Sequence, residues 1–199
     1  MPEEDDRFRD VDYLMDEIRQ ALSWTAEARE VNELQALQLL LDLTRKIHSI
    51  QDIQELITLI LDSAITFVDA DRAFLVMLEG DGALRFKMGR SRHKEYLSAE
   101  MFTPSTGVIE RTLEKGRTLL VPDAQADSVL SKRRSVQDLN LRTVVCTPLM
   151  VKKNPIGLLY VDCQHSLGSY SAAHLNVFAS LADQAAVAIK NAQKFETRT

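Results

Sequence analysis

The sequence predicts an α+β fold, in which an antiparallel sheet is flanked by helices. No glycine or proline occurs between Pro2 and Gly80, so this leading part of the chain is free of helix breakers. Two pairs of apolar segments, each pair separated by a short turn signal, have the pattern of β-hairpins. After Ser171 the apolar side chains repeat at spacings of three and four, which is typical of a helix.

The leading segment, residues 1–35, is predicted to be an acidic helical extension. Apolar residues in this segment and just after it recur at helical spacing in two runs, Val11, Met15, Ile18 and Leu22, then Leu34, Leu37 and Leu41. So narrow a stripe is typical of a helix–helix seam or coiled coil. Residues 1–30 contain 10 acidic and 4 basic side chains, a net charge of −6, whereas the whole chain carries −5. The main body is therefore close to neutral, unlike a typical nucleic-acid-binding domain.

A second helix is predicted from Asp52, because Asp52 and Glu55 have the spacing of a capping box. Its apolar face comprises Ile53, Leu56, Ile57, Ile60, Ala64 and Phe67. A hairpin follows, in which a continuous apolar run at 73–78 is joined to an alternating segment at 84–88. The turn between them contains Asp81 and Gly82, a common hairpin pair.

No regular element is predicted for residues 89–104. Beyond them the sequence predicts, in order, a helix over Thr106–Lys115 that stops at Gly116, a strand over 118–121, a helix around 132–139, strands over 142–151 and 156–163, and a helix that Ser171 caps and that runs towards the chain end. The last two strands are joined at 152–155 and make a second hairpin. Successive hairpins form an antiparallel sheet, and the flanking helices can pack on one of its faces.

Four stretches carry a family resemblance: VDADRAFLVML at 68–78, RTLLVPDAQAD at 117–127, LNLRTVVCTPLMVKKNPIGLLYVDC at 139–163 and YSAAHLNVFASLADQAAVAIKNAQKFE at 170–196. They resemble the GAF family of sensory domains and occur in that family's order. The resemblance covers residues 36–196. It implies a five- or six-stranded antiparallel sheet with helices packed on one face, and long N-terminal and C-terminal signalling helices. It also implies a ligand pocket between the other face and residues 89–140, but it names no ligand.

The residues that catalysis or a covalent cofactor would need do not stand at matching positions. Cys146 and Cys163 are the only cysteines, and their spacing does not resemble the set used by GAF-type methionine sulfoxide reductases. Residues 80–140 contain no cysteine to which a bilin could be attached, and no histidine has metal-ligand spacing. Of the signature with which relatives bind cyclic nucleotides, only an aromatic residue is kept, as Tyr170. We therefore expect no enzyme activity and no metal, and the sequence identifies no cofactor.

A mostly apolar pocket with a few polar groups is the expected site. Its predicted apolar lining is Phe74, Val76, Val108, Ile109, Val144 and Tyr160, of which strand alternation allows only some to face inward. The start of the short helix, formed by Ser105, Thr106 and Gly107, offers backbone N–H groups to an anion or a ligand carbonyl, although simple capping accounts for the same residues. For an anionic ligand, Arg85 and Arg142 are the predicted counter-charges.

One local cluster of basic residues stands out: Arg85, Lys87, Arg90, Arg92, His93 and Lys94. On a strand Arg85 and Lys87 share one face, so they could point together at an anionic ligand or partner. A solvated sheet edge is the simpler interpretation of the cluster.

The sequence thus favours a regulatory module of a larger cytoplasmic signal-transduction protein, which senses an unidentified small molecule. Pocket occupancy would change the packing of helices over 8–48 and 172–196, through which we expect a homodimer, and a C-terminal effector beyond Thr199 would receive the signal. The alternative is a structural dimerisation module with no ligand. No nucleic acid is expected as a partner, because the main body is close to neutral. No membrane is expected either, because no apolar run approaches the roughly 18 residues that a membrane helix needs.

Overall fold

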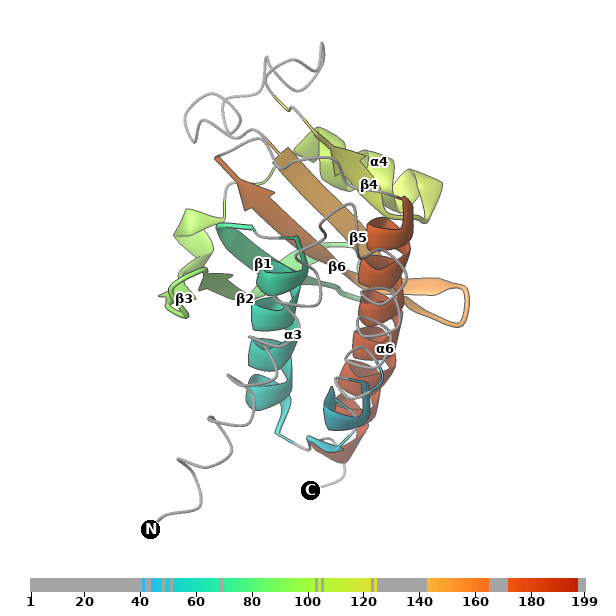
Figure 1. Cartoon of the computed structure of the whole chain (residues 1–199). Coiled ribbons are helices and arrows are strands. Elements are labelled where there is room, and N and C mark those ends of the chain that lie inside the picture. The colour runs from blue at the N-terminus through green and yellow to red at the C-terminus, as the bar shows by residue number, and fades with distance from the viewer. Residues whose placement is uncertain are drawn as a thin grey trace.

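The computed structural model in Figure 1 describes residues 41, 44–47, 49–50, 52–68, 70–102, 104, 106–122, 124, 143–164 and 172–196. Within these ranges, six strands form one antiparallel sheet in the order β3-β2-β1-β6-β5-β4. The predicted α+β class and antiparallel sheet are therefore confirmed. The predicted extension at 1–35 and the helix around 132–139 lie outside the described residues.

Helix α3 (Ile53–Val68) begins where the capping pattern predicts. The Asp52 carboxylate accepts a hydrogen bond from the backbone N–H of Glu55 at 2.8 Å, which satisfies one of the donors that a helix start leaves open. The predicted apolar face is buried against the sheet through Ile53, Leu56, Ile57, Ile60 and Ala64.

Both predicted hairpins are present. The first consists of β1 (Arg72–Leu78) and β2 (Leu84–Ser91), and the second of β5 (Thr143–Val151) and β6 (Asn154–Cys163). Because β1 pairs with β6, the two hairpins lie side by side in the middle of the sheet. Two short strands complete its edges, β3 (Tyr96–Leu97) beside β2 and β4 (Leu119–Val121) beside β5.

Helices cover the two faces of the sheet unequally. On the first face, α3 packs beside the longer helix α6 (Ala172–Glu196), and the two lie side by side in Figure 1. The core between them contains Leu75 of β1, Val145 of β5 and Phe178 of α6, all buried. The second face is covered at one end by α4 (Thr106–Lys115), which contacts β4 and β5. As predicted, the two long helices therefore share one face.

The stretch at 89–104 is more regular than the sequence predicts. β2 continues through Gly89 to its end at Ser91, β3 pairs with it, and a short 3-10 helix, η1 (Ala99–Met101), follows. In the structure a Cβ atom on Gly89 would lie 2.7 Å from Cδ1 of Phe74, so the aromatic ring fills the place of the missing side chain.

Candidate ligand-binding face

The second face of the sheet carries a compact apolar layer, here called the second-face layer. Its buried members are Phe74, Val108, Ile109, Val121, Ala124, Val144, Cys146, Leu158 and Tyr160, and its partly buried members are Leu84, Phe86, Leu97, Phe102, Leu113 and Leu119. They come from all six strands of the sheet, from α4, from the segment between η1 and α4, and from the residues just after β4. The layer is separated from the larger core by the sheet itself, because successive residues of a strand point to opposite faces.

The structure brings the predicted apolar lining together. Phe74, Val108, Val144 and Tyr160 all belong to the second-face layer. Val76 is buried two residues further along β1 from Phe74, opposite Leu158, so it lies on the same face. That these side chains contact a ligand remains a prediction.

The predicted polar residues divide into two groups. Thr106 and Gly107 form the first turn of α4 at the layer, where Gly107 is buried and Thr106 is exposed. Ser105 and Arg142 lie outside the described residues. Their predicted contacts with a ligand therefore rest on the sequence.

Arg85 is not brought to the layer. Its Nε lies 2.8 Å from Oε2 of Glu79, its Nη2 lies 3.6 Å from Oδ2 of Asp81, and its side chain is 59% exposed. Its neighbours on β2, Leu84 and Phe86, pack against the second-face layer, so alternation directs Arg85 away from it. The structure thus separates this predicted counter-charge from the predicted lining.

An aromatic group at the layer's centre was missed by the sequence reasoning. The ring of Phe102 lies 5.0 Å from that of Phe74, 5.9 Å from that of Phe86 and 5.9 Å from that of Tyr160, which it meets edge to face. Such pairs each contribute about 0.5–1.5 kcal/mol beyond the burial of their area. Phe102 lies in the stretch for which no element was predicted, where it is the only phenylalanine. That isolated aromatic residue was the available signal.

A buried ion pair borders the same layer. Arg72 donates to both carboxylate oxygens of Asp162, at 2.9 and 2.7 Å, and its Nη1 donates to the backbone carbonyl of Met101 at 3.3 Å. The guanidinium also lies 5.2 Å from the centre of the Phe74 ring. Burial raises the pKa of Asp162, and the contact with Arg72 offsets part of that shift. The pair ties β1 and β6 to the chain segment that carries Phe102.

The sequence carries one signal for this pair: Arg72 and Asp162 are charged residues at the ends of two apolar runs, and the strand register places them opposite each other. Without the register, nothing connects two residues so far apart along the chain.

The two cysteines are buried as protonated thiols. Burial raises the pKa of Cys146 to about 12 and that of Cys163 to about 11. The thiolate is the nucleophilic form of cysteine, so neither side chain is activated at neutral pH. Among the described residues, no group of three or more His, Cys, Asp or Glu side chains could hold a metal ion.

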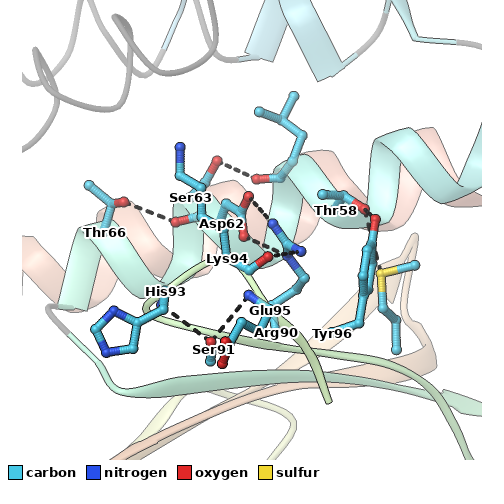
Figure 2. A network of polar contacts seen from close by, with 12 residues as sticks. Thr58, Asp62, Ser63, Thr66, Arg90, Ser91, His93, Lys94, Glu95 and Tyr96 are labelled. Atoms are coloured by element: carbon cyan, nitrogen blue, oxygen red, sulfur yellow. Dashed lines mark hydrogen bonds and ion pairs between the residues drawn. The ribbon is translucent and has the colours of Figure 1, made fainter. Parts of the chain in front are cut away.

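The basic cluster on β2 and after it is not a single cationic patch. Figure 2 shows Arg90 beneath α3, where Nε lies 2.9 Å from Oδ1 of Asp62 and Nη2 lies 3.0 Å from Oδ2. The guanidinium also stacks on Tyr96, 4.6 Å from the ring centre, and the Tyr96 hydroxyl lies 3.3 Å from that of Thr58. Arg92 pairs with Asp71 at 3.5 Å. The solvated-edge interpretation is therefore wrong for Arg90, which fastens the sheet edge to α3.

No helix in the described ranges has the length and apolar character to cross a bilayer.

Comparison with known proteins adds a family and a set of solved folds. The family model for the GAF domain matches residues 50–190. The GAF domain of a phosphoenolpyruvate-protein phosphotransferase from Coxiella burnetii superimposes with a TM-score of 0.63 at 15% identity, over 81% of this chain and 96% of that one. A GAF domain from Synechocystis, solved in its photoproduct state, gives 0.61 at 16% identity, over 74% and 99%.

A third structure, the GAF domain/HD domain protein from Geobacter sulfurreducens, gives a TM-score of 0.57 at 17% identity, over 72% of this chain and 96% of that one. At these identities the likeness shows a common fold. None of the curated proteins matches the chain.

Proposed function

The chain belongs to the GAF domain family, and on that basis we propose that it is a regulatory module that senses a small molecule within a larger signal-transduction protein. The ligand would occupy the second-face layer, and its binding would change the packing of α6. We further propose that the module has no catalytic activity of its own, since both thiols are buried and protonated.

One observation carries this proposal: β5 is shared by both layers of the molecule. Val144 and Cys146 face the second-face layer, whereas Val145 and Leu149 face the core beneath α3 and α6. Every residue of β5 from Thr143 to Leu149 is buried. Because protein interiors are close-packed, a shift of β5 towards or away from α4 must be accommodated by the helices on its other side. A ligand drives this change if it binds one arrangement better than the other.

The layer also indicates what kind of ligand would fit. Its walls are aliphatic and aromatic, and the start of α4 adds polar groups beside them. We propose a ligand with a flat apolar body and one carbonyl or anionic end, the end facing Thr106, Gly107 and the predicted Ser105 and Arg142. Phe102 is only partly buried and follows η1 outside any helix or strand, so its ring is the one that a ligand would most easily replace.

Ligand-dependent unfolding tests this proposal. A true binder present at a hundredfold excess over its Kd should raise the free energy of unfolding by about 2.7 kcal/mol, which a thermal-shift screen of small metabolites detects. Ile109→Phe adds volume on the side of α4 that faces the layer and should abolish the shift for a genuine hit. Glu110→Phe, at an exposed position on α4 next to Ile109, is the matched control. Hits that survive Ile109→Phe unchanged would place binding elsewhere.

A structural dimerisation module with no ligand is the second candidate. It is favoured by the way the aromatic side chains of the protein itself occupy the second-face layer, and by exposed apolar residues such as Leu41 and Val187 in the helical segments. Under this alternative no metabolite would shift the melting temperature, and Ile109→Phe would change stability alone.

A further inference from the structure

A cleft beside α6 is built from parts of the chain that the second-face layer does not use. It has a volume of about 390 Å³ and is lined by the residues after α4, by β5, by the turn of the second hairpin and by one side of α6. In Figure 1 that hairpin projects beside α6, on the side away from α3. Thr147 lines the cleft and lies on the same face of β5 as Val145 and Leu149. The cleft therefore opens on the same side of the sheet as α6.

The charges around this cleft are unbalanced. Arg117, Lys152 and Lys153 line it, against a single carboxylate, Asp183, which leaves a formal charge of +3 − 1 = +2. None of the three cations forms an ion pair with a residue that the structure describes.

The arginines on and beside the first hairpin, unlike the cations of the cleft, each form an ion pair within the part of the chain that the structure describes. Arg72, Arg85, Arg90 and Arg92 each have a carboxylate oxygen 2.7–3.5 Å from a guanidinium nitrogen. Leaving cations together without carboxylate partners is electrostatically unfavourable, so the cleft is a place where an external anion would relieve repulsion.

The backbone and the threonines give the cleft a defined shape. Lys152 and Lys153 form the two-residue turn between Val151 and Asn154, and Lys152 is held in the left-handed region at φ 60°, which a lysine seldom adopts. The hydroxyls of Thr118 and Thr147 lie 2.8 Å apart on the cleft lining, and Thr147 is buried. Hydroxyl donors together with cations are the groups that bind compact oxyanions.

We propose that this cleft binds a compact dianion, a phosphate group or a small dicarboxylate, through Arg117, Lys152 and Lys153. Ala179 and Asp183 place α6 directly against the bound anion. Occupancy would therefore give the long helix a second input that does not pass through the sheet. The site does not depend on the ligand proposed for the second-face layer.

Titration of the full chain with inorganic phosphate and with succinate, at ionic strength held constant with sodium chloride, tests the site. We expect saturable binding by calorimetry. Lys152→Gln and Arg117→Gln should each weaken it about tenfold, the loss expected for a charged hydrogen bond. Lys190→Gln, which removes an exposed lysine of α6 outside the cleft, should leave the Kd unchanged. Asp183→Asn should tighten binding, because it removes the one opposing charge.

A steric variant separates this site from general attraction to a basic surface. Ala179→Leu fills the cleft without changing its charge and should abolish binding, whereas Val187→Leu, elsewhere on α6, should not. Saturation by phosphate alone would assign a phosphate group, and saturation by succinate alone or by both would assign the wider dianion class. The proposal fails if neither anion saturates the wild-type chain, or if Ala179→Leu and Lys152→Gln bind as well as wild type. Metabolites whose binding is blocked by Ile109→Phe should bind Ala179→Leu as well as they bind wild type. The two proposed sites can therefore be confirmed or rejected independently.

Discussion

At the scale of single residues, the buried polar side chains serve structural roles. Arg90 and Asp62 form a two-point contact between β2 and α3, Arg72 and Asp162 form one between β1 and β6, and two thiols are enclosed in apolar surroundings. Each ion pair is satisfied within the fold. These groups therefore hold elements together and are not poised for reaction.

The thiols provide the first prediction. With the pKa of Cys146 at about 12 and that of Cys163 at about 11, less than about one molecule in a thousand carries a thiolate at pH 8. A chromogenic disulfide reagent should leave the native chain unlabelled on a timescale of minutes and label two thiols in urea. The folded pKa of Cys146 exceeds the ordinary value of 9.0. The contribution of the protonated Cys146 thiol to the free energy of unfolding is therefore complete below pH 9 and is lost as the pH rises towards 12. Rapid labelling of native protein at pH 8 would show an activated cysteine.

The pair at α3 provides the second. Arg90→Met leaves the Asp62 carboxylate without its partner in a largely buried place and should lower the free energy of unfolding by about 3–5 kcal/mol in urea titrations. Arg85→Met removes an ion pair whose two side chains are exposed and should cost about 1 kcal/mol or less. Equal losses in the two variants would mean that Arg90 does not fasten the sheet edge to α3.

Residue roles were the hardest feature to predict from the sequence. Phe74, Val108, Val144 and Tyr160 could be placed on one surface because apolar residues on strands and helices must find a core. Arg85 was misplaced because the inward face of β2 is set by Leu84 and Phe86, and an alternating strand does not state which of its faces is covered.

At the scale of elements, β5 connects the two layers, because alternate side chains of this strand belong to different layers. Its partner β6 contains Gly157, which the close approach of β1 requires. A Cβ atom there would collide with the backbone carbonyl of Val76 and would lie 3.2 Å from Cα of Met77.

Gly157→Ala should therefore destabilise the fold by about 1–3 kcal/mol, the usual cost of forcing extra volume into a packed interior. The matched control is Gly80→Ala in the first hairpin turn, where an added Cβ would have no neighbour within 4 Å. Urea denaturation of both variants compares them directly. If Gly157→Ala is as stable as Gly80→Ala, the register of β1 and β6 differs from the one described.

Elements with local signals were predicted well. α3 has its cap at Asp52, α4 ends at Gly116 with φ 58°, and the second hairpin turns at two lysines. β3 and η1 were missed because a two-residue strand and a three-residue helix are too short to show a period. β3 forms through its pairing with Gly89 and Arg90 of β2.

At the scale of the whole molecule, the sheet separates a face covered by long helices from the face that we propose binds a ligand. The homodimer proposed for the helical side predicts that Leu41, which is 54% exposed, is covered by a partner. Leu37→Glu combined with Leu41→Glu should convert dimers to monomers in sedimentation velocity at micromolar concentration. Met101→Glu, at an exposed position in η1, should leave the dimer intact. A wild-type chain that sediments as a monomer would rule out the proposed interface.

We propose that a ligand in the second-face layer alters the packing of α6 on the other side of the sheet. Hydrogen exchange measured with and without a metabolite that Ile109→Phe blocks tests it most directly. We expect altered exchange both in α4, at Thr106–Lys115, and in α6, at Ala172–Glu196, although α6 lies on the opposite face. Protection confined to α4 and the strands beside it, with α6 unchanged, would contradict it.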